Sequence, residues 1–311
     1  MTTPRAAAPT IAVGPHSAAF AEDAVRAGGG RPVKLGEPAD ALVWLSAHDL
    51  GPLRAVLEDQ PRIRWVQLPF AGVEKAFEDG VIDAGRLWTC AKGSYAEPVA
   101  EHALALALAG LRRLPDRVRA RTWGRPEGTT LYGARVTVLG AGGITRELMR
   151  LLAPFGVETT VVRRADEPLP GAARTVTTGR LADALPGALV VVVALALTPE
   201  TTGIVGASAL EAMDERAWLV NVARGRHVRT DALVEALRQG SISGAALDVT
   251  DPEPLPDGHP LWTAPNCIIT PHSADTWEMI LPHLAARIRD NVARFAAGRA
   301  LEGLVDPAAG Y

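Results

Sequence analysis

Short apolar runs alternate along the chain with stretches in which apolar residues recur at helical spacing. The runs that predict strands cover residues 11–13, 41–45, 63–68, 87–90, 136–139, 157–162, 189–194, 218–223, 244–249 and 267–270. Helical spacing covers residues 53–57, 146–155 and 231–237, and we expect Asp231 to cap the last of these helices and Gly240 to stop it. This alternation predicts parallel sheets of the α/β class.

Two further helices indicate how the chain is divided into domains. An almost wholly apolar helix starts at Glu97-Pro98 and continues to Leu111. Apolar residues on every side indicate burial, so we interpret it as the connector between two domains. Near the C-terminus one helical face carries Leu281, Leu284, Ile288, Val292 and Phe295. This last helix is expected to cross back and cover the first domain.

The strand at 136–139 runs into a glycine-rich turn, Gly140-Ala141-Gly142-Gly143-Ile144-Thr145, and then into a helix. Strand, glycine turn and helix together are typical of a site for a dinucleotide pyrophosphate. Gly140 permits the tight turn, Gly142 lets the backbone approach the anion, and the helix N-terminus faces it. Thr145 stands where glycine or alanine is usual. We expect it to push the helix slightly outward and to weaken binding.

Arg163 and Arg164 follow the next strand, about 20 residues beyond the glycines. At that place a carboxylate would bind the ribose 2′-hydroxyl of NAD. Two guanidinium groups can instead hold a 2′-phosphate bidentately, which favours NADP(H) over NAD(H) while leaving NAD(H) possible. The alternative is that these arginines only solvate a loop.

Composition excludes several classes of protein. The chain has 311 residues, 48% of them hydrophobic and 22% charged, with a net charge of −3. These values are typical of a globular protein of two domains without a general attraction to nucleic acid or to an anionic membrane. Two cysteines are too few for a disulfide framework, so we expect a cytoplasmic protein. No signal peptide, membrane span or metal-binding histidine spacing is expected.

Six arginines crowd the segment after the apolar helix, with Trp123 as its only aromatic residue. They are Arg112, Arg113, Arg117, Arg119, Arg121 and Arg125. We interpret this segment as a solvated helix and a subunit-contact arm rather than as a nucleic-acid surface.

Polar residues stand just beyond three late strands: Arg224, Glu253 and His272. Ligands bind at the carboxyl ends of the strands in an open parallel sheet, so all three could converge on the nicotinamide face. Each also has a structural interpretation, as a turn residue, a solvated loop residue and a hydrogen-bonded core histidine. The loop at 69–73 offers backbone N–H groups to a carboxylate, and an ordinary strand-to-helix turn explains it equally well.

Several segments in combination resemble the D-isomer-specific 2-hydroxyacid dehydrogenases. They read V-N-V-A-R-G at 220–225, A-L-D-V-T-D-P-E-P-L-P at 246–256, H-P-L-W at 259–262 and I-T-P-H at 269–272, and V-A-E-H at 99–102 and L-T-P-E-T at 197–201 agree. The resemblance extends from about residue 65 to the end and is greatest to the short glyoxylate/hydroxypyruvate reductases. It implies a flavodoxin-like substrate domain at 1–96 and 276–311, a Rossmann NAD(P)-binding domain at 97–275, and a homodimer.

The resemblance also implies roles for individual residues. His272 would be the acid/base, Glu253 would hydrogen-bond it and raise its pKa, and Arg224 would bind the carboxylate and keto oxygens of a small 2-keto acid. The backbone of Ala71, Gly72 and Val73 would hold the substrate carboxylate. The residues implied to contact the cofactor are Gly140, Gly142, Gly143, Ile144, Arg163, Arg164, Leu195, Thr198, Val222, Ala223 and Asp248.

Some positions depart from the family pattern, namely Thr145, Ala196, the basic stretch 226–229 and Ser273-Ala274-Asp275. These departures and the arginine-rich segment motivate an alternative, a dinucleotide-sensing binding protein like the family's transcriptional corepressors. A second alternative is an enzyme acting on a bulky substrate, with Phe70 and Trp277 lining the pocket. Formate dehydrogenases share the fold, but glutamine is expected there in place of Glu253. The complete set of Arg224, Glu253 and His272 favours the reductase.

Overall fold

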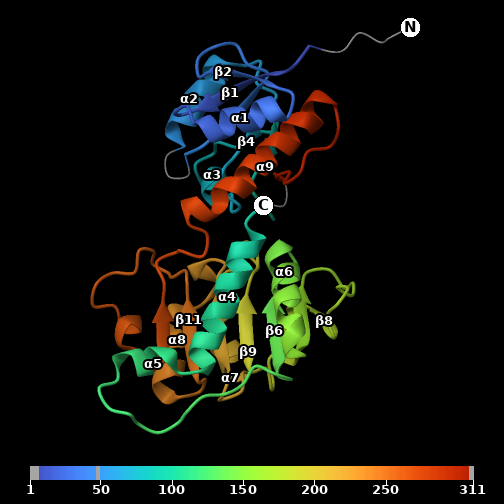
Figure 1. Cartoon of the computed structure of the whole chain (residues 1–311). Coiled ribbons are helices and arrows are strands. Elements are labelled where there is room, and N and C mark those ends of the chain that lie inside the picture. The colour runs from blue at the N-terminus through green and yellow to red at the C-terminus, as the bar shows by residue number, and fades with distance from the viewer. Residues whose placement is uncertain (1–6, 47–49, 308–311) are drawn as a thin grey trace. The chain divides into compact units, whose positions relative to one another are not determined.

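The computed structural model describes residues 7–46 and 50–307. The chain divides into two compact units (Figure 1). The first combines residues 1–95 with residues 276–311, and the second is the continuous stretch 96–275. Each unit is a parallel sheet covered by helices. The expected α/β class with two doubly wound sheets is therefore confirmed.

The first unit contains a sheet of five parallel strands in the order β2-β1-β3-β4-β5, which is the flavodoxin-like order. Its strands are β1 (Thr10–Gly14), β2 (Arg31–Lys34), β3 (Ala41–Trp44), β4 (Trp65–Gln67) and β5 (Leu87–Thr89). Its helices are α1 (Ala19–Ala27), α2 (Gly51–Asp59), α3 (Glu74–Glu78) and α9 (Trp277–Ala296). Strand β2 was not expected, because this edge strand is partly exposed and has no apolar run to mark it.

Helix α9 packs beside α1 on the sheet of the first unit, as expected (Figure 1). Its buried face holds Ile280, Leu284, Ile288 and Val292, so Ile280 takes the core position that we expected of Leu281. A polar residue, Asn291, is also fully buried there. Its amide donates 2.9 Å hydrogen bonds to Gln67 Oε1 and to the carbonyl of Glu302, while Glu302 N–H donates to Asn291 Oδ1. This cluster fixes the helix on the sheet, because a buried amide without partners would be costly.

The second unit contains seven parallel strands in the order β12-β11-β10-β9-β6-β7-β8. They are β6 (Arg135–Leu139), β7 (Glu158–Arg163), β8 (Arg174–Thr177), β9 (Val190–Val193), β10 (Trp218–Asn221), β11 (Gly244–Leu247) and β12 (Cys267–Ile269). The helices are α4 (Ala96–Leu111), α5 (Leu114–Arg119), α6 (Gly143–Leu152), α7 (Ala207–Glu211) and α8 (Thr230–Gln239). Short 3₁₀ turns, labelled η1 to η4, cover Ala153–Phe155, Thr178–Asp183, Gly225–His227 and Pro260–Thr263. Strand order reverses between β6 and β9, as in a Rossmann fold.

Three details of the second unit differ from the sequence expectations. Helix α8 is flanked by Arg229, and Asp231 lies inside the first turn, exposed and 3.7 Å from the Arg229 guanidinium, so it does not cap the helix. Helix α6 begins at Gly143 and not at residue 146, because the last glycine of the turn lies within the helix. The edge strand β8 was missed, since its alternating polar residues are only partly buried.

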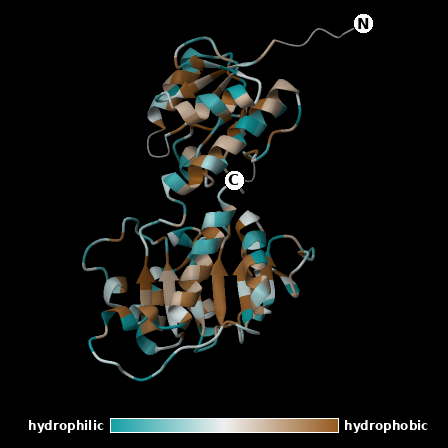
Figure 2. Ribbon diagram, in the orientation of Figure 1, coloured by the Kyte–Doolittle hydropathy of each residue, from teal (hydrophilic) through white to brown (hydrophobic). Residues whose placement is uncertain are grey.

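Helix α4 is apolar because the second unit buries it against its own sheet. Its glycine, Gly110, lies against Trp218 of β10, and a Cβ there would meet the indole at 2.4 Å. Figure 2 shows the matching hydrophobic colour of the central strands of this unit. None of the helices within residues 7–46 and 50–307 has the length and apolar content that a membrane span requires.

Candidate functional site

The glycine turn lies where strand order reverses in the second sheet, between β6 and β9. Gly140 has φ of +118°, and a Cβ there would meet the carbonyl oxygen of Ala194 at 2.3 Å. Glycine is therefore required, because the turn leaving β6 touches the end of β9. At Gly142 a Cβ would meet nothing within 4 Å. This open space in front of the first N–H groups of α6 fits a pyrophosphate, and no side chain fills it.

Thr145 is accommodated by a hydrogen bond within the turn. Its side chain is fully buried, and its hydroxyl donates to the carbonyl of Gly140 at 2.9 Å. The β-branched residue thus ties the first turn of α6 to the glycine that starts the turn. It supplies a polar contact where glycine or alanine would supply only space.

Arg163 and Arg164 stand beside the glycine turn, because β7 pairs with β6 and Gly140 N–H donates to the carbonyl of Val162 at 2.7 Å. The Arg163 guanidinium lies 3.3 Å from the carbonyl oxygen of Glu167. Arg164 is exposed and lies close enough to Glu200 to contribute to the lowered pKa of that carboxyl, which is due first to a hydrogen bond from Thr198. Two positive charges therefore flank the edge of the turn.

His272 and Glu253 form a close pair. The imidazole Nδ1 lies 2.7 Å from Glu253 Oε1, and Glu253 Oε2 accepts a 3.3 Å hydrogen bond from the N–H of Thr250. The hydrogen bond to Glu253 raises the pKa of His272 above its usual value, although partial burial opposes the rise. The same bond lowers the pKa of Glu253. Arg224 is near enough to act electrostatically on both groups, so the structure brings the three polar residues together.

Asp248 holds the segment that carries His272. Its carboxylate accepts hydrogen bonds from Thr270 Oγ1 at 2.6 Å, Ser273 N–H at 2.9 Å and Ala274 N–H at 3.1 Å, and lies 3.3 Å from His102 Nε2. Burial alone would raise the pKa of Asp248, but these contacts, led by His102, lower it to about 2. The Asp248 carbonyl also accepts the N–H of His272, which takes the left-handed conformation with φ of +52°. Such a conformation persists only where neighbouring contacts hold it.

The backbone around Arg224 is packed against both neighbouring loops. A Cβ at Gly225 would lie 1.9 Å from the carbonyl oxygen of Thr250, which only glycine permits. Asn221 Nδ2 donates to the Arg224 carbonyl at 2.9 Å, and Asn221 Oδ1 accepts the N–H of Ala223. The Arg224 guanidinium donates to the Ala223 carbonyl at 2.7 Å.

The remaining expected cofactor residues lie along the same edge of the second sheet. Val222 and Ala223 are nearly buried after β10. Leu195 and Thr198 follow β9, and Thr198 N–H donates to Thr201 Oγ1 at 2.8 Å. Within the described ranges, no three His, Cys, Asp or Glu side chains gather in a way that could hold a metal ion.

In the first unit, the loop of Ala71, Gly72 and Val73 joins β4 to α3. Val73 contributes its side chain to the core, with 2% of its surface exposed. Among the described residues, no acceptor is found for the N–H groups of Ala71, Gly72 and Val73. Three neighbouring donors are thus available in this loop.

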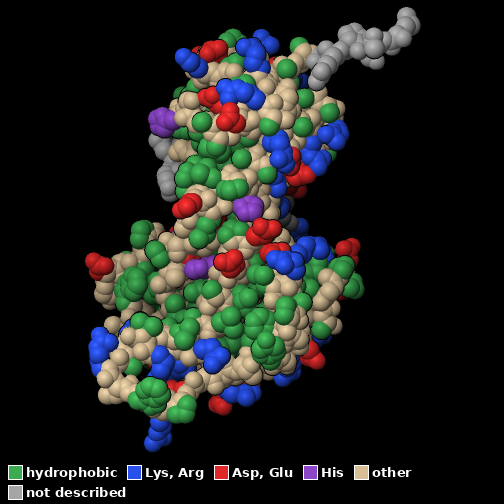
Figure 3. All heavy atoms as spheres, viewed as in Figure 1, with side chains coloured by type: hydrophobic (Ala, Val, Ile, Leu, Met, Phe, Trp, Pro, Cys, Tyr) green, Lys and Arg blue, Asp and Glu red, His purple; other side chains and the backbone are tan. Residues whose placement is uncertain are grey.

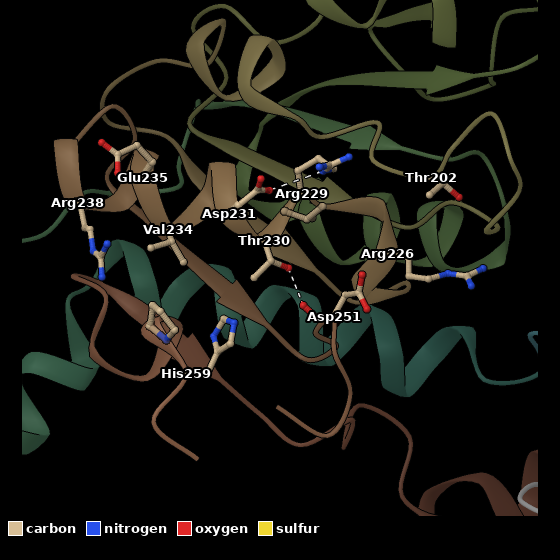
Figure 4. Close-up of a pocket in the computed structure, with 12 residues that line it drawn as sticks. Thr202, Arg226, Arg229, Thr230, Asp231, Val234, Glu235, Arg238, Asp251 and His259 are labelled. Carbon is tan, nitrogen blue, oxygen red and sulfur yellow. Dashed lines mark hydrogen bonds and ion pairs between the residues drawn. The ribbon is translucent and has the colours of Figure 1, made fainter. Parts of the chain in front are cut away.

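A cavity of about 690 Å³ in the second unit lies beside α8 (Figure 4). Its wall includes Arg226, Arg229, Asp231 and His259, with an Arg229–Asp231 ion pair. Both positive and negative side chains line it. Arg224, Glu253 and His272 are not among its lining residues, although Arg226 and Asp251 of the same loops are.

Comparison with known proteins decides the family. The model of the D-isomer specific 2-hydroxyacid dehydrogenase NAD-binding domain matches residues 102–274. A Corynebacterium melassecola protein described as "uncharacterized protein in proB 3'region" is 41% identical over 80% of this chain and 84% of its own length. A glyoxylate/hydroxypyruvate reductase A from Serratia proteamaculans is 31% identical over 88% of each chain. Among solved structures, this chain is similar to a D-isomer specific 2-hydroxyacid dehydrogenase from Xanthobacter autotrophicus Py2, crystallised with NADPH and MES. The two superpose with a TM-score of 0.84 and are 29% identical in sequence. The match covers 98% of this chain and 100% of that one.

The chain belongs to the D-isomer specific 2-hydroxyacid dehydrogenase family. It is accordingly an oxidoreductase acting on a CH–OH group, and residues 102–274 form its NAD-binding domain. The expected family and enzyme class are both confirmed.

Sequence patterns did not indicate every residue that shapes this dehydrogenase site. His102 was noted only as part of a motif, although it contacts Asp248 from the start of α4. Asn221 and His227, which bond to the Arg224 carbonyl, were not singled out for that role. Asp248 was expected to contact the cofactor, and the structure shows in addition that its carboxylate accepts hydrogen bonds from the backbone after His272. A polar residue inside an apolar run, such as Asp248, is the one local signal of such contacts.

We predict that Glu253→Gln lowers the pKa of His272, because a neutral amide cannot stabilise the imidazolium as a carboxylate does. An NMR pH titration of the His272 ring signals measures the effect. Asp251→Asn, in the same loop, is the matched control and should leave the titration unchanged. An unchanged His272 pKa in Glu253→Gln would mean that the 2.7 Å contact does not govern the ring.

Proposed function

We propose that the chain is an NADPH-preferring reductase that converts a small 2-keto acid, of the glyoxylate or hydroxypyruvate kind, into the D-2-hydroxy acid. The observation that carries the proposal is the His272–Glu253 pair, with Arg224 beside it, in an NAD-binding domain. The similar Serratia protein is named a glyoxylate/hydroxypyruvate reductase, and the similar Xanthobacter protein was crystallised with NADPH. Both support the proposal.

The second unit offers the contacts that a dinucleotide needs. Gly140, Gly142, Gly143 and Ile144 would receive the pyrophosphate at the N-terminus of α6. Arg163 and Arg164 would hold the 2′-phosphate. The nicotinamide end of the cofactor would be contacted by Leu195, Thr198, Val222, Ala223 and Asp248. When bound, NADPH supplies the hydride that reduces the keto carbon.

His272 carries the proton in this proposal. Because Nδ1 is bonded to Glu253, Nε2 is the nitrogen that gives its proton to the keto oxygen. Reduction needs the protonated ring, and the raised pKa of His272 keeps it protonated to higher pH than an ordinary histidine. The reduction rate should therefore be full below this pKa and fall as pH rises through it. In Glu253→Gln the fall should move to lower pH.

Arg224 and the loop at 71–73 would bind the substrate. The Arg224 guanidinium suits a carboxylate and the negative charge that develops on the keto oxygen. The N–H groups of Ala71, Gly72 and Val73, for which the described part of the chain holds no acceptor, suit a carboxylate as well.

We predict that the wild-type protein oxidises NADPH with glyoxylate or hydroxypyruvate, and that His272→Asn lowers kcat at least about 100-fold. Absorbance at 340 nm follows the turnover, and calorimetry should give an NADPH Kd within about threefold of wild type, because a proton donor is lost and not a cofactor contact. The matched control is His259→Asn, which should keep activity. Loss of both turnover and NADPH binding in His272→Asn would indicate a structural histidine. Dinucleotide binding by wild type without turnover of any 2-keto acid would support the sensor alternative.

We predict that Arg163→Asp combined with Arg164→Ala shifts the cofactor preference toward NADH by at least about 10-fold in kcat/KM. Charge-assisted hydrogen bonds to a phosphate are worth about 1.5–3 kcal/mol each. The loss of one such bond is therefore enough to change kcat/KM for NADPH by about 10-fold. Steady-state kinetics with both cofactors measures the shift. Arg180→Asp with Arg216→Ala changes the charge equally at exposed sites and serves as the control. Unchanged NADPH selectivity would remove the 2′-phosphate assignment.

We also propose that two copies associate through the second unit, using α5 and the segment that follows it. Here Val118 is 78% exposed, Trp123 98% and Tyr132 67%, unusual values for large apolar side chains. Figure 3 shows hydrophobic and basic side chains together in this region. Sedimentation velocity should give the mass of a dimer for wild type, and Val118→Ser with Trp123→Ser should shift it toward a monomer. A wild-type monomer would contradict the proposal.

A further inference from the structure

His227 is a buried polar side chain in the 3₁₀ turn that follows Arg224. It is fully buried, whereas the neighbouring Arg226 and Arg229 line the surface cavity (Figure 4). A buried imidazole needs hydrogen-bond partners, because burial without them is costly. Its Nδ1 lies 3.1 Å from the carbonyl oxygen of Arg224, and its Nε2 lies 3.3 Å from that of Ala196.

These two carbonyls belong to the loops after β10 and β9, which both carry candidate site residues. Further along, the loops are joined by backbone bonds. Gly203 N–H donates to the Arg226 carbonyl at 2.8 Å, and Val205 N–H donates to the His227 carbonyl at 3.0 Å. The imidazole of His227 adds a side-chain bridge between the same loops at Ala196 and Arg224.

The contacts of His227 affect the Arg224 guanidinium through the backbone. The guanidinium donates a hydrogen bond to the Ala223 carbonyl, so its position depends on where the peptide groups on either side of Arg224 lie. On one side, Gly225 lies so close to Thr250 that a Cβ at Gly225 would be 1.9 Å from the Thr250 carbonyl oxygen. On the other side, His227 fills the space toward Ala196.

We propose that His227 is a positioning residue for Arg224, and that its Nδ1–H, donated to the Arg224 carbonyl, is the contact that matters. A neutral imidazole carries one N–H and donates to one of the two carbonyls at a time. The Nδ1 contact with the Arg224 carbonyl is the shorter of the two, at 3.1 Å against 3.3 Å for Nε2 and the Ala196 carbonyl. Both carbonyls also accept other donors: Arg224 accepts Asn221 Nδ2 and the N–H of His227, and Ala196 accepts the Thr201 hydroxyl. The proposal rests on the proposed function, in which Arg224 binds the 2-keto acid.

Substitution of His227 by asparagine or glutamine distinguishes the two contacts. The amide nitrogen of asparagine lies near the position of Nδ1, and that of glutamine lies near the position of Nε2. At saturating NADPH, His227→Asn should keep kcat/KM for the keto acid within about threefold of wild type. His227→Gln and His227→Leu should lower it at least about 10-fold, since small misplacements of a catalytic group are costly. The NADPH Kd should stay within about twofold in all three. An active His227→Gln with an impaired His227→Asn would overturn the proposal.

Combining variants distinguishes positioning from general destabilisation. In an Arg224→Lys background, His227→Leu should cost less than about twofold in kcat/KM, because the group it positions is already changed. An equal loss in both backgrounds would indicate a structural role and overturn the proposal. Val205→Ala removes packing from the same loop without touching the Arg224 carbonyl, so it should lower Tm and keep kcat/KM.

Binding of oxalate separates failure of this inference from failure of the proposed function. Oxalate resembles a 2-keto acid and does not react, so calorimetry with the protein–NADPH complex needs no turnover. If wild type turns over no acceptor, the proposed function fails. The inference still stands if Arg224→Lys and His227→Leu weaken oxalate binding while His227→Asn preserves it. Oxalate binding that His227→Leu leaves unchanged, or that wild type lacks, would overturn it.

Discussion

The rest of the site depends on the hydrogen bonds that the buried carboxylate of Asp248 accepts. Removing a carboxylate from water costs free energy. Hydrogen bonds from the segment that follows β12 offset this cost for Asp248. A shift of this segment would therefore take three hydrogen-bond donors away from a buried charge and leave it with His102. His272 keeps its left-handed backbone for that reason, and its ring reaches Glu253. The His272–Glu253 pair is thus placed by a residue that takes no part in the pairing.

The parallel order of the strands in the second sheet also positions the site residues. Strands β9, β10, β11 and β12 end at one edge, so the loops that leave them lie next to one another. The loop with Arg224 touches the β9 loop through His227 and the β11 loop through Gly225. Each loop restricts its neighbour, and a rigid site results from segments with little regular structure of their own.

Much of this fold follows from local patterns, and the part that does not has definite physical causes. The core strands and the turn at Gly140 were predictable, because burial demands apolar runs and the close approach to Ala194 demands glycine. The edge strands β2 and β8 escaped notice, since partial exposure leaves them without such runs. Arg224, Glu253 and His272 were predictable as strand-end residues. The bonds from His102 to Asp248 and from Asn291 to Gln67 were not, because they join residues far apart in the chain.

The buried Asn291 has a consequence for how the protein is made. The second unit is one continuous stretch, and its sheet is complete once residue 275 has left the ribosome. The first unit begins the chain but needs α9 to cover its sheet, and Gln67 meets Asn291 only when the last part of the chain has been synthesised. The unit translated first is therefore finished last. A premature stop between residues 275 and 291 would leave the dinucleotide-binding unit whole while depriving the first unit of much or all of the helix that covers it.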